Sequence, residues 1–224
     1  MNTGQLTKKS FFQKHRKLLI FLSLLLLAST VLIILIAYSP RTYQPAQPAN
    51  PNELSPYLTH KLGPDFYNQV QLDQPFELII EQEGINDILA RYLWPIQIEG
   101  FTVYTPILYL KPDGITLMAQ VNFKGLSAIL SVAAKPYLDS DKKMNINIQS
   151  VYLGALPITP LAQKLAQKFV QEHFDPQDPI ESVNYAIVSN QPFDPILYMF
   201  GKSARITELT LEVGRARLFL TPIQ

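Results

Sequence analysis

The first forty residues combine a basic leader with an unbroken apolar run. The run extends from Leu18 to Tyr38, reads LLIFLSLLLLASTVLIILIAY and contains no charged residue. A helix rises 1.5 Å per residue, so about 20 such residues cross the roughly 30 Å hydrocarbon core of a bilayer. The pattern therefore predicts a transmembrane helix over residues 18–38, with the bilayer as its partner.

Two other interpretations of this run fit less well. A cleavable signal peptide has an apolar region of about 7–15 residues, whereas this run is longer and is soon followed by Pro40. A buried core helix would show a polar stripe. The run contains only Ser23, Ser29 and Thr30 as polar residues, and these can bond to carbonyls of their own helix. We interpret it as an uncleaved anchor.

Charge on either side of the run predicts the orientation of the chain. Residues 1–17 contain five Lys and Arg, the first acidic residue is Glu53, and Arg41 is the one basic residue in the twenty positions after the run. The positive-inside rule then predicts a cytoplasmic leader and an extracytoplasmic segment 39–224. The predicted location is the cell (inner) membrane, crossed once.

Five prolines follow within residues 39–56. Proline at this density favours extended polyproline II and disfavours helices and central strands. We predict a linker that could hold the remaining residues, 57–224, up to about 55 Å from the bilayer if it were fully extended. A disordered tether of no fixed length is an alternative that the composition leaves open.

The pattern changes to period two between Phe101 and Leu153. Apolar and polar residues alternate over 115–123 and again over 126–134, as in strands with one buried face. Asp113-Gly114 and the polar cluster 139–143 supply turns. This pattern predicts an antiparallel meander of about four strands.

Period 3.6 returns in two places. The segment 160–174 carries an apolar stripe, with Thr159 able to cap it and Pro160 suited to the first turn, and 84–94 carries a second stripe. A helical turn is expected at 57–62, ended by Gly63-Pro64. Further strands are expected at Pro75–Glu81, Arg205–Val213 and Arg215–Pro222, whereas 184–189 has no clear pattern.

These elements predict an α+β fold. A curved antiparallel sheet of about six to seven strands wraps on one long amphipathic helix and one shorter helix, because neither the apolar sheet face nor the apolar helix stripe is stable alone in water. One transmembrane helix precedes these elements. Residues 57–224 then form one extracytoplasmic domain.

Two motifs carry a resemblance. FELIIEQEGINDILARYL, a strand followed by a short helix with an early Asn, and VYLGALPITPLAQKLAQKF, a turn that leads into an amphipathic helix, resemble the YpmS-type family of membrane-anchored bacterial proteins of unknown function. The order of elements over residues 75–222 is also similar to half of a tubular lipid-binding (TULIP-type) domain. The resemblance implies a curved sheet around a helix, with a lipid-lined groove and no catalytic residue.

Composition narrows the function further. Setting aside the five basic residues of the leader leaves 14 Lys and Arg against 18 Asp and Glu, and the chain has no cysteine. An acidic exported part disfavours nucleic acid as a partner. The lack of cysteine excludes disulfides, thiol catalysis and thiolate metal sites.

No catalytic or metal motif accompanies the remaining candidates. Beyond His15 in the leader, His60 and His173 are isolated, so a hydrolase or zinc site has little support. Asp139-x-Asp141 begins like a calcium loop but lacks the glycine and acidic residue that such a loop needs later, and a hairpin turn explains it better. The glycines form no phosphate-binding cluster. We predict a protein that is not an enzyme and has no cofactor.

Two hypotheses of different classes remain. The first is a lipid or apolar-ligand groove between sheet and helix, lined by Leu117, Val121, Leu130, Ile146, Leu161, Leu165 and Phe169. The second is a cell-envelope interaction protein with a packed core and a surface patch at Ile196, Leu197, Met199 and Phe200, although 192–205 could also be a short helix that covers the sheet. A cavity of several hundred Å³ would distinguish the first from the second.

Overall fold

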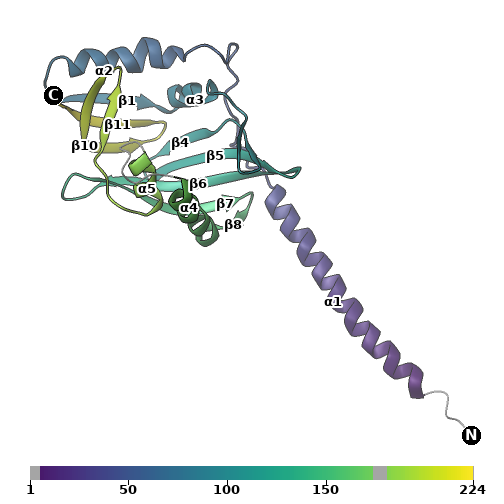
Figure 1. Ribbon diagram of the computed structural model, residues 1–224. Helices are drawn as coiled ribbons and strands as arrows, with labels where there is room; N and C mark the ends of the chain where they lie inside the picture. The colour runs from purple at the N-terminus through teal and green to yellow at the C-terminus, as the bar shows by residue number, and fades with distance from the viewer. Residues whose placement is uncertain (1–5, 174–180, 224) are drawn as a thin grey trace, which may run out of the picture.

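The computed structural model describes residues 6–173 and 181–223, in which one long helix projects from a compact body (Figure 1). This helix, α1, covers Leu6–Ala37 and so begins inside the basic leader. Its segment Arg16–Ala37 is long and apolar enough to span a membrane, and none of that segment is buried against the body. The predicted spanning helix is therefore present, with its C-terminal end at Ala37.

The body contains two antiparallel sheets, which confirms the predicted α+β class. The strand order is β2-β3-β5-β6-β7-β8 in the larger sheet, where β4 also pairs with β5, and β1-β11-β10-β9 in the smaller. The larger sheet contains β2 (Ile96–Ile98), β3 (Phe101–Val103), β4 (Ile107–Lys111), β5 (Gly114–Phe123), β6 (Leu126–Leu138), β7 (Met144–Leu153) and β8 (Leu156–Pro157). The smaller contains β1 (Phe76–Glu81), β9 (Ile196–Met199), β10 (Lys202–Glu212) and β11 (Arg215–Ile223).

The larger sheet has one apolar face, as its period-two pattern predicts. Leu117 on β5 lies between Leu108 on β4 and Val132 on β6, and partners that face each other across antiparallel strands share a side of the sheet. The same parity continues to Phe123 and Leu126 at the β5–β6 turn. The opposite face carries mainly Thr, Ser, Asn and Gln side chains, but Met118 and the buried Ile129 and Ser131 also lie on it.

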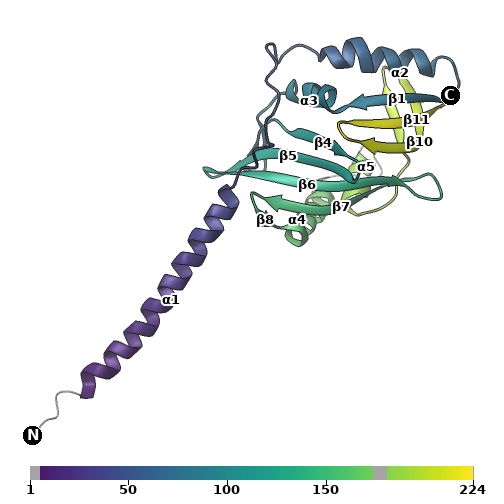
Figure 2. The same ribbon diagram turned by 180° about the vertical axis from the view of Figure 1, so that it is seen from behind.

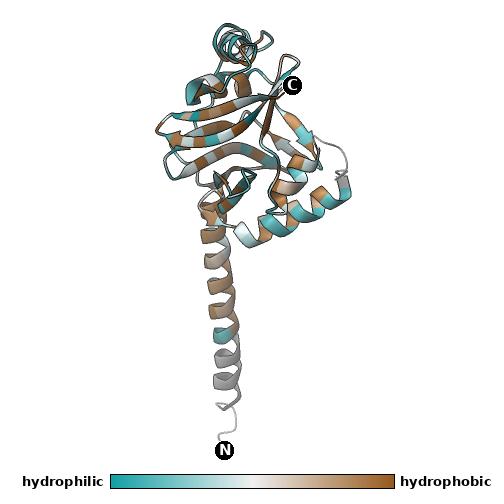
Figure 3. Cartoon of the chain, turned by 90° about the vertical axis from the view of Figure 1, so that its left-hand side faces the viewer, coloured by the Kyte–Doolittle hydropathy of each residue, from teal (hydrophilic) through white to brown (hydrophobic). Residues whose placement is uncertain are grey.

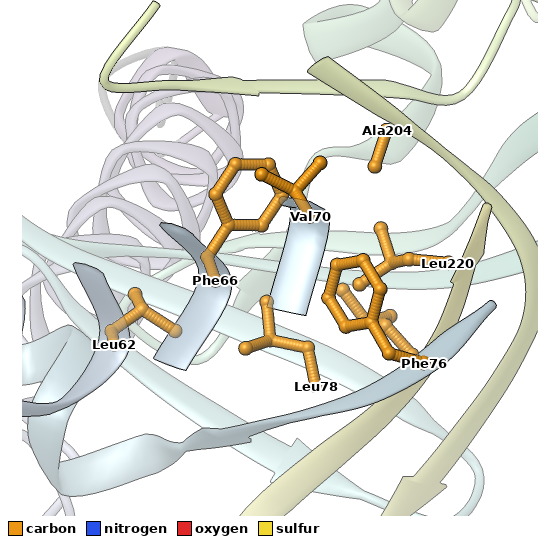
Figure 4. Close-up of a cluster of buried hydrophobic side chains, with 8 residues drawn as sticks. Leu62, Phe66, Val70, Phe76, Leu78, Ala204 and Leu220 are labelled. Atoms are coloured by element: carbon orange, nitrogen blue, oxygen red, sulfur yellow. The ribbon is translucent and has the colours of Figure 1, made fainter. Parts of the chain in front are cut away.

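A helix over residues 58–70 covers the core of the smaller sheet, and the sequence pattern predicts only its first turn. The π-helical turn η1 (Leu58–Leu62) continues directly into α2 (Gly63–Val70). Figure 4 shows Phe66 of α2 above Phe76 and Leu220, and the two rings meet edge to face with their centroids 6.0 Å apart. Phe66 and Leu220 are completely buried, so this end of the sheet is closed.

The prediction that Gly63-Pro64 ends the helix is wrong. Pro64 lies in the first turn of α2, where its missing N–H costs no hydrogen bond. A Cβ at Gly63 would come within 3.0 Å of the Phe200 ring and of the Leu58 carbonyl. Gly63 therefore permits close packing of the β9–β10 turn on this helix.

Three further helices flank the sheets: α3 (Gln82–Ala90), α4 (Thr159–His173) and α5 (Glu181–Val188). α3 ends four residues before the predicted end at Trp94, and Tyr92 and Leu93 are exposed beyond it. α4 agrees with the predicted 160–174 as far as His173, and Phe174 lies outside the described residues. α4 packs beside β7 instead of being enclosed by the sheet, whose apolar face is partly covered by the second sheet.

The proline-rich linker does not extend away from the body. Its first part crosses the polar face of the larger sheet, where the Tyr43 hydroxyl donates to the Thr105 carbonyl at 2.8 Å and the Tyr109 hydroxyl donates to the Thr42 carbonyl. Burial raises the pKa of Tyr43. Figures 1 and 2 show this segment running along the side of the body from α1 to α2.

The second part of the linker is bound to α3. The Arg91 guanidinium donates to the Asn50 carbonyl at 2.9 Å and forms an ion pair with Asp87 at 3.0 Å. The buried Ser55 hydroxyl also donates to Asp87. The structure thus differs from the predicted free spacer, because hydrogen-bond donors of the body satisfy linker carbonyls that would otherwise face water.

The end of α1 is bound to the body at the turn between β7 and β8. The Ala155 amide donates to the Leu35 carbonyl at 2.8 Å, which is one of the carbonyls left free at a helix C-terminus. Gly154, at φ +62°, lies so close that a Cβ would come within 3.0 Å of the Leu35 and Ile36 carbonyl oxygens. The long helix is thus attached to the body at its base as well as by the linker.

An apolar cavity between the two sheets

The two apolar sheet faces line a cavity of about 400 Å³ that is partly open to solvent. The smaller sheet contributes Ile206, Leu209 and Ala216, and the larger sheet contributes Ile115 and Ile146. α3 and α5 add one apolar side chain each. The remaining lining residues are Ile80, Ile85, Leu108, Leu110, Pro136, Met144, Val183, Phe193, Asp194, Pro195, Ile196, Leu197, Leu211 and Leu218.

Side chains of α3 hold the two sheets together at the wall of this cavity. The buried Asn86 amide donates to the Leu108 carbonyl at 2.9 Å and accepts from the Leu108 amide at 2.7 Å. Gln82 accepts from the Leu110 amide at 2.7 Å, and the Gly214 amide donates to the Leu110 carbonyl at 3.0 Å. The edge of β4 that lacks a partner strand is thereby satisfied, and Leu108 and Leu110 are directed into the cavity.

A polar cluster lies at one end of the cavity. Asp194 lines it and pairs with Arg205 at 3.2 Å and with Lys143 at 3.8 Å. These three side chains are about half exposed, so the cluster is accessible to water. A larger surface recess beside α5 also includes Asp194 and Lys143 in its lining and adjoins the cavity.

The apolar sheet face continues beyond the cavity toward the β5–β6 turn. From Ile115, which lines the cavity, the same side of β5 continues through Leu117 and Val121 to Phe123. Eight residues of strand cover about 26 Å. Leu117 and Phe123 are each 40% exposed, so no other described element completely covers this stretch. The cavity and this stretch together form one apolar track.

The predicted groove residues lie on this track only in part. Ile146 lines the cavity. Leu117, Val121 and Leu130 share the same face of the sheet but lie outside the cavity, between it and the β5–β6 turn. Leu161, Leu165 and Phe169 lie on α4 and do not line the cavity, and Leu161 and Leu165 are exposed.

The predicted surface patch is split by the structure. Residues 196–199 form strand β9 rather than a helix, so alternate side chains point to opposite sides. Leu197 and Met199 lie on one side of β9 and pack against the core of the smaller sheet, where Leu197 also reaches the cavity wall. Ile196 lies on the other side of β9 and lines the cavity. Phe200 is exposed at the β9–β10 turn.

Sequence reasoning missed the contribution of β10 to the cavity. Ile206, Leu209 and Leu211 line it from β10, where a bulge between Ile206 and Glu208 changes the alternation. The bulge hides the period-two signal, because one extra residue moves later side chains to the other face. Ile85 lies in the predicted stripe 84–94, but that stripe does not indicate which sheet the helix packs against.

The histidines and carboxylates of the described residues form no group that could hold a metal ion. His60 is exposed and lies 3.2 Å from the Thr59 hydroxyl. Within residues 6–173 and 181–223, no group of three or more His, Cys, Asp or Glu side chains could hold a metal ion. Asp139 occupies a hairpin turn, accepts from the Asp141 and Lys143 amides at 2.9 Å each, and has a lowered pKa because of such bonds.

Comparison with known proteins adds no family assignment. No protein-family model matches the chain, and no curated protein is significantly similar to it. The class of protein is therefore defined by what the structure contains: an α+β body with an apolar cavity, attached to a helix able to span a membrane.

Proposed function

We propose that this protein is anchored in the cell membrane by α1 and binds a lipid or another apolar ligand with its extracytoplasmic body. The observation that carries the proposal is the chemistry of the cavity. Of the described residues that line it, only Asp194 is not apolar, and the volume lies within the range of small-molecule sites. Such a lining favours hydrocarbon and offers little to a polar substrate.

The location of the cavity supports a lipid over other apolar ligands. The apolar track that extends from the cavity is about 26 Å long, which exceeds the roughly 15 Å half-thickness of a bilayer core. The track is therefore as long as an extended acyl chain. The proposal also agrees with the resemblance of this chain to YpmS-type and TULIP-type proteins, which we retain as a proposal.

A specific observation favours one alternative, a cell-envelope interaction protein. Tyr198 and Phe200 are 73% and 56% exposed on β9 and its turn, and Tyr67 of α2 is exposed nearby. Phe200 and Tyr67 also line a hollow of about 380 Å³ on the surface of α2. Exposed aromatic side chains beside a hollow are typical of protein-binding surfaces.

The proposal is tested by filling the cavity. Ile146→Trp places an indole into it, whereas Asn147→Trp places the same group on the exposed opposite face of β7 and serves as the matched control. The full chain, purified from membranes, is analysed by native mass spectrometry with lipid extraction. We expect the wild type and Asn147→Trp to retain a lipid that Ile146→Trp has lost.

Two results would contradict the proposal. One is a wild-type protein that carries no apolar molecule and takes up none when lipid is added. The other is equal retention of lipid by Ile146→Trp and Asn147→Trp, which would locate the lipid outside the cavity. Circular dichroism of both variants must match the wild type for the comparison to hold.

A further inference from the structure

The side of the body that faces α1 carries its own exposed apolar side chains. Figure 3 shows α4 on the side of the body from which α1 leaves, and Figures 1 and 2 place the β5–β6 turn beside the end of α1. Because the Ala155 amide bonds to the Leu35 carbonyl, this side is held next to the end of the apolar helix segment. The exposed side chains on this side of the body therefore indicate what surrounds the end of α1.

The first exposed group is the β5–β6 turn. Phe123 and Leu126 are 40% and 68% exposed, and Phe101 stacks on Phe123 with ring centroids 4.6 Å apart. The Lys124 ammonium lies 5.3 Å from the centre of the Phe123 ring. Leu126 is three residues from Ile129, whose carbonyl accepts from the Gly154 amide, so the turn lies within about 11 Å of that contact.

The second exposed group is the outer face of α4. Leu161 and Leu165 are 57% and 59% exposed, although they belong to the apolar stripe of this helix. Lys164 and Lys168 lie on the adjoining side of the helix. Lys164 follows Leu161 by three residues, and Lys168 follows Leu165 by three residues. α4 begins four residues after Ala155, so Leu161 lies within about 22 Å of the α1 attachment.

We propose that the β5–β6 turn and the outer face of α4 form a surface that rests on the bilayer spanned by α1. The bilayer is inferred as the contacting surface because both exposed groups flank the point where the apolar helix α1 meets the body. It also follows from charge: Lys124 and Lys164 accompany the exposed apolar residues, a combination that suits anionic headgroups around a shallow apolar insertion, whereas Lys168 pairs with Glu172 at 3.7 Å.

This surface deepens the proposed function and rests on the membrane-spanning role of α1. Phe123 and Leu126 form the end of the apolar track that leads to the cavity. With the turn seated in the leaflet, the track opens into hydrocarbon instead of water. A lipid then passes from leaflet to cavity along Val121 and Leu117 without exposing its acyl chain.

The absence of cysteine from the chain permits a direct test with single-cysteine labels. The full chain is labelled with a fluorophore at Leu126→Cys or Leu165→Cys and reconstituted in vesicles of phosphatidylcholine and phosphatidylglycerol that contain a nitroxide-labelled lipid. Val213→Cys, on the 81% exposed β10–β11 turn, is the matched control for the body. Leu26→Cys reports whether α1 is inserted.

We expect labels at positions 126 and 165 to lose most of their emission to the lipid quencher, and the label at position 213 to lose no more than a dye free in solution. Equal, weak quenching at all three body positions with strong quenching at position 26 would overturn this inference and leave the anchor intact. Weak quenching at position 26 would overturn the anchor proposal and this inference together. Lipid bound in the cavity is measured separately by mass spectrometry.

Discussion

Asn86 is the residue on which the junction between the two sheets most depends. It is buried, and its amide both donates to and accepts from the backbone of Leu108. No other strand of the described residues pairs with that edge of β4 at Leu108. Loss of this side chain therefore leaves two backbone groups without partners.

We expect Asn86→Ala to lower the free energy of unfolding by about 2–4 kcal/mol, since a buried group left without a partner costs about 1–3 kcal/mol. Asn147→Ala, at an exposed position on β7, is the control and should change stability by less than about 0.5 kcal/mol. Urea denaturation of both variants provides the measurement. Equal midpoints for the two variants would contradict the role assigned to Asn86.

Some residues could be interpreted from the sequence, and others only from contacts. The Asp139 turn was predicted correctly because a short carboxylate that accepts nearby amides is a local interaction. Gly63 was interpreted as a helix stop, because the reason for its presence, the Phe200 ring, lies far away in the sequence. Nothing local distinguishes a glycine that ends a helix from one that admits a neighbour.

At the scale of elements, the attachment of α1 to the β7–β8 turn is the feature with the clearest consequence. Gly154 permits it in two ways, through its positive φ and through the space that a side chain would occupy. Gly201 has a similar φ of +73° but no heavy atom within 4 Å of the position of a Cβ. Substitutions at these two glycines therefore distinguish the effect of backbone strain, which both share, from the effect of the contact with α1, which only Gly154 makes.

We expect Gly154→Ala to detach α1 from the body and Gly201→Ala to leave the attachment intact. Spin labels at Leu26→Cys and Val213→Cys, in vesicles, report the distance between α1 and the body by electron–electron double resonance. The distance distribution should be narrow in the parent and in Gly201→Ala, and broad in Gly154→Ala. A distribution that stays equally narrow in Gly154→Ala would show that this contact does not orient the body.

Elements with a regular pattern were predicted well. β5, β6 and β11 and the helix α4 match their predicted ranges to within a few residues, because the alternation and the amphipathic stripe are long. The segment 196–199 was less informative, since four apolar residues in a row fit either a short helix or a strand. Its pairing with β10 decided the outcome, and pairing is a tertiary property.

The same limit applied to the candidate site. Apolar faces on the strands predicted a groove, and a cavity exists, but its position between two sheets depends on β1, β10 and β11 forming a separate sheet. The sequence suggested one sheet around α4. Six of the seven predicted groove residues consequently lie outside the cavity, and Ile146 alone lines it.

At the scale of the whole molecule, the linker joins opposite sides of the body. It leaves α1, crosses the polar face of the larger sheet and reaches α2 on the far side, held in its second part by Arg91 (Figure 2). Proline gives this segment few hydrogen bonds of its own. Its order therefore depends on donors such as Arg91 and Tyr43.

We expect Arg91→Met, which keeps a long apolar stem and removes the donors, to speed amide hydrogen exchange in residues 49–55 while exchange in β10 and β11 stays unchanged. Arg205→Met, which breaks an exposed ion pair away from the linker, is the control. Hydrogen exchange followed by mass spectrometry distinguishes the two. Unchanged protection of 49–55 in Arg91→Met would mean that the linker is held by other contacts.

The pairing of β1 with β11 has a consequence for how the protein is made. Phe76 pairs with Leu220, so β1 can join β11 only when nearly the whole chain has been synthesised. The meander from β3 to β7 pairs with sequence neighbours and closes early, since short loops cost little entropy. Its apolar face then lacks the contacts that β10 and β11 make with it in the complete fold. The face of the meander that lines the cavity is therefore completed only when the C-terminal strands are available to pack on it.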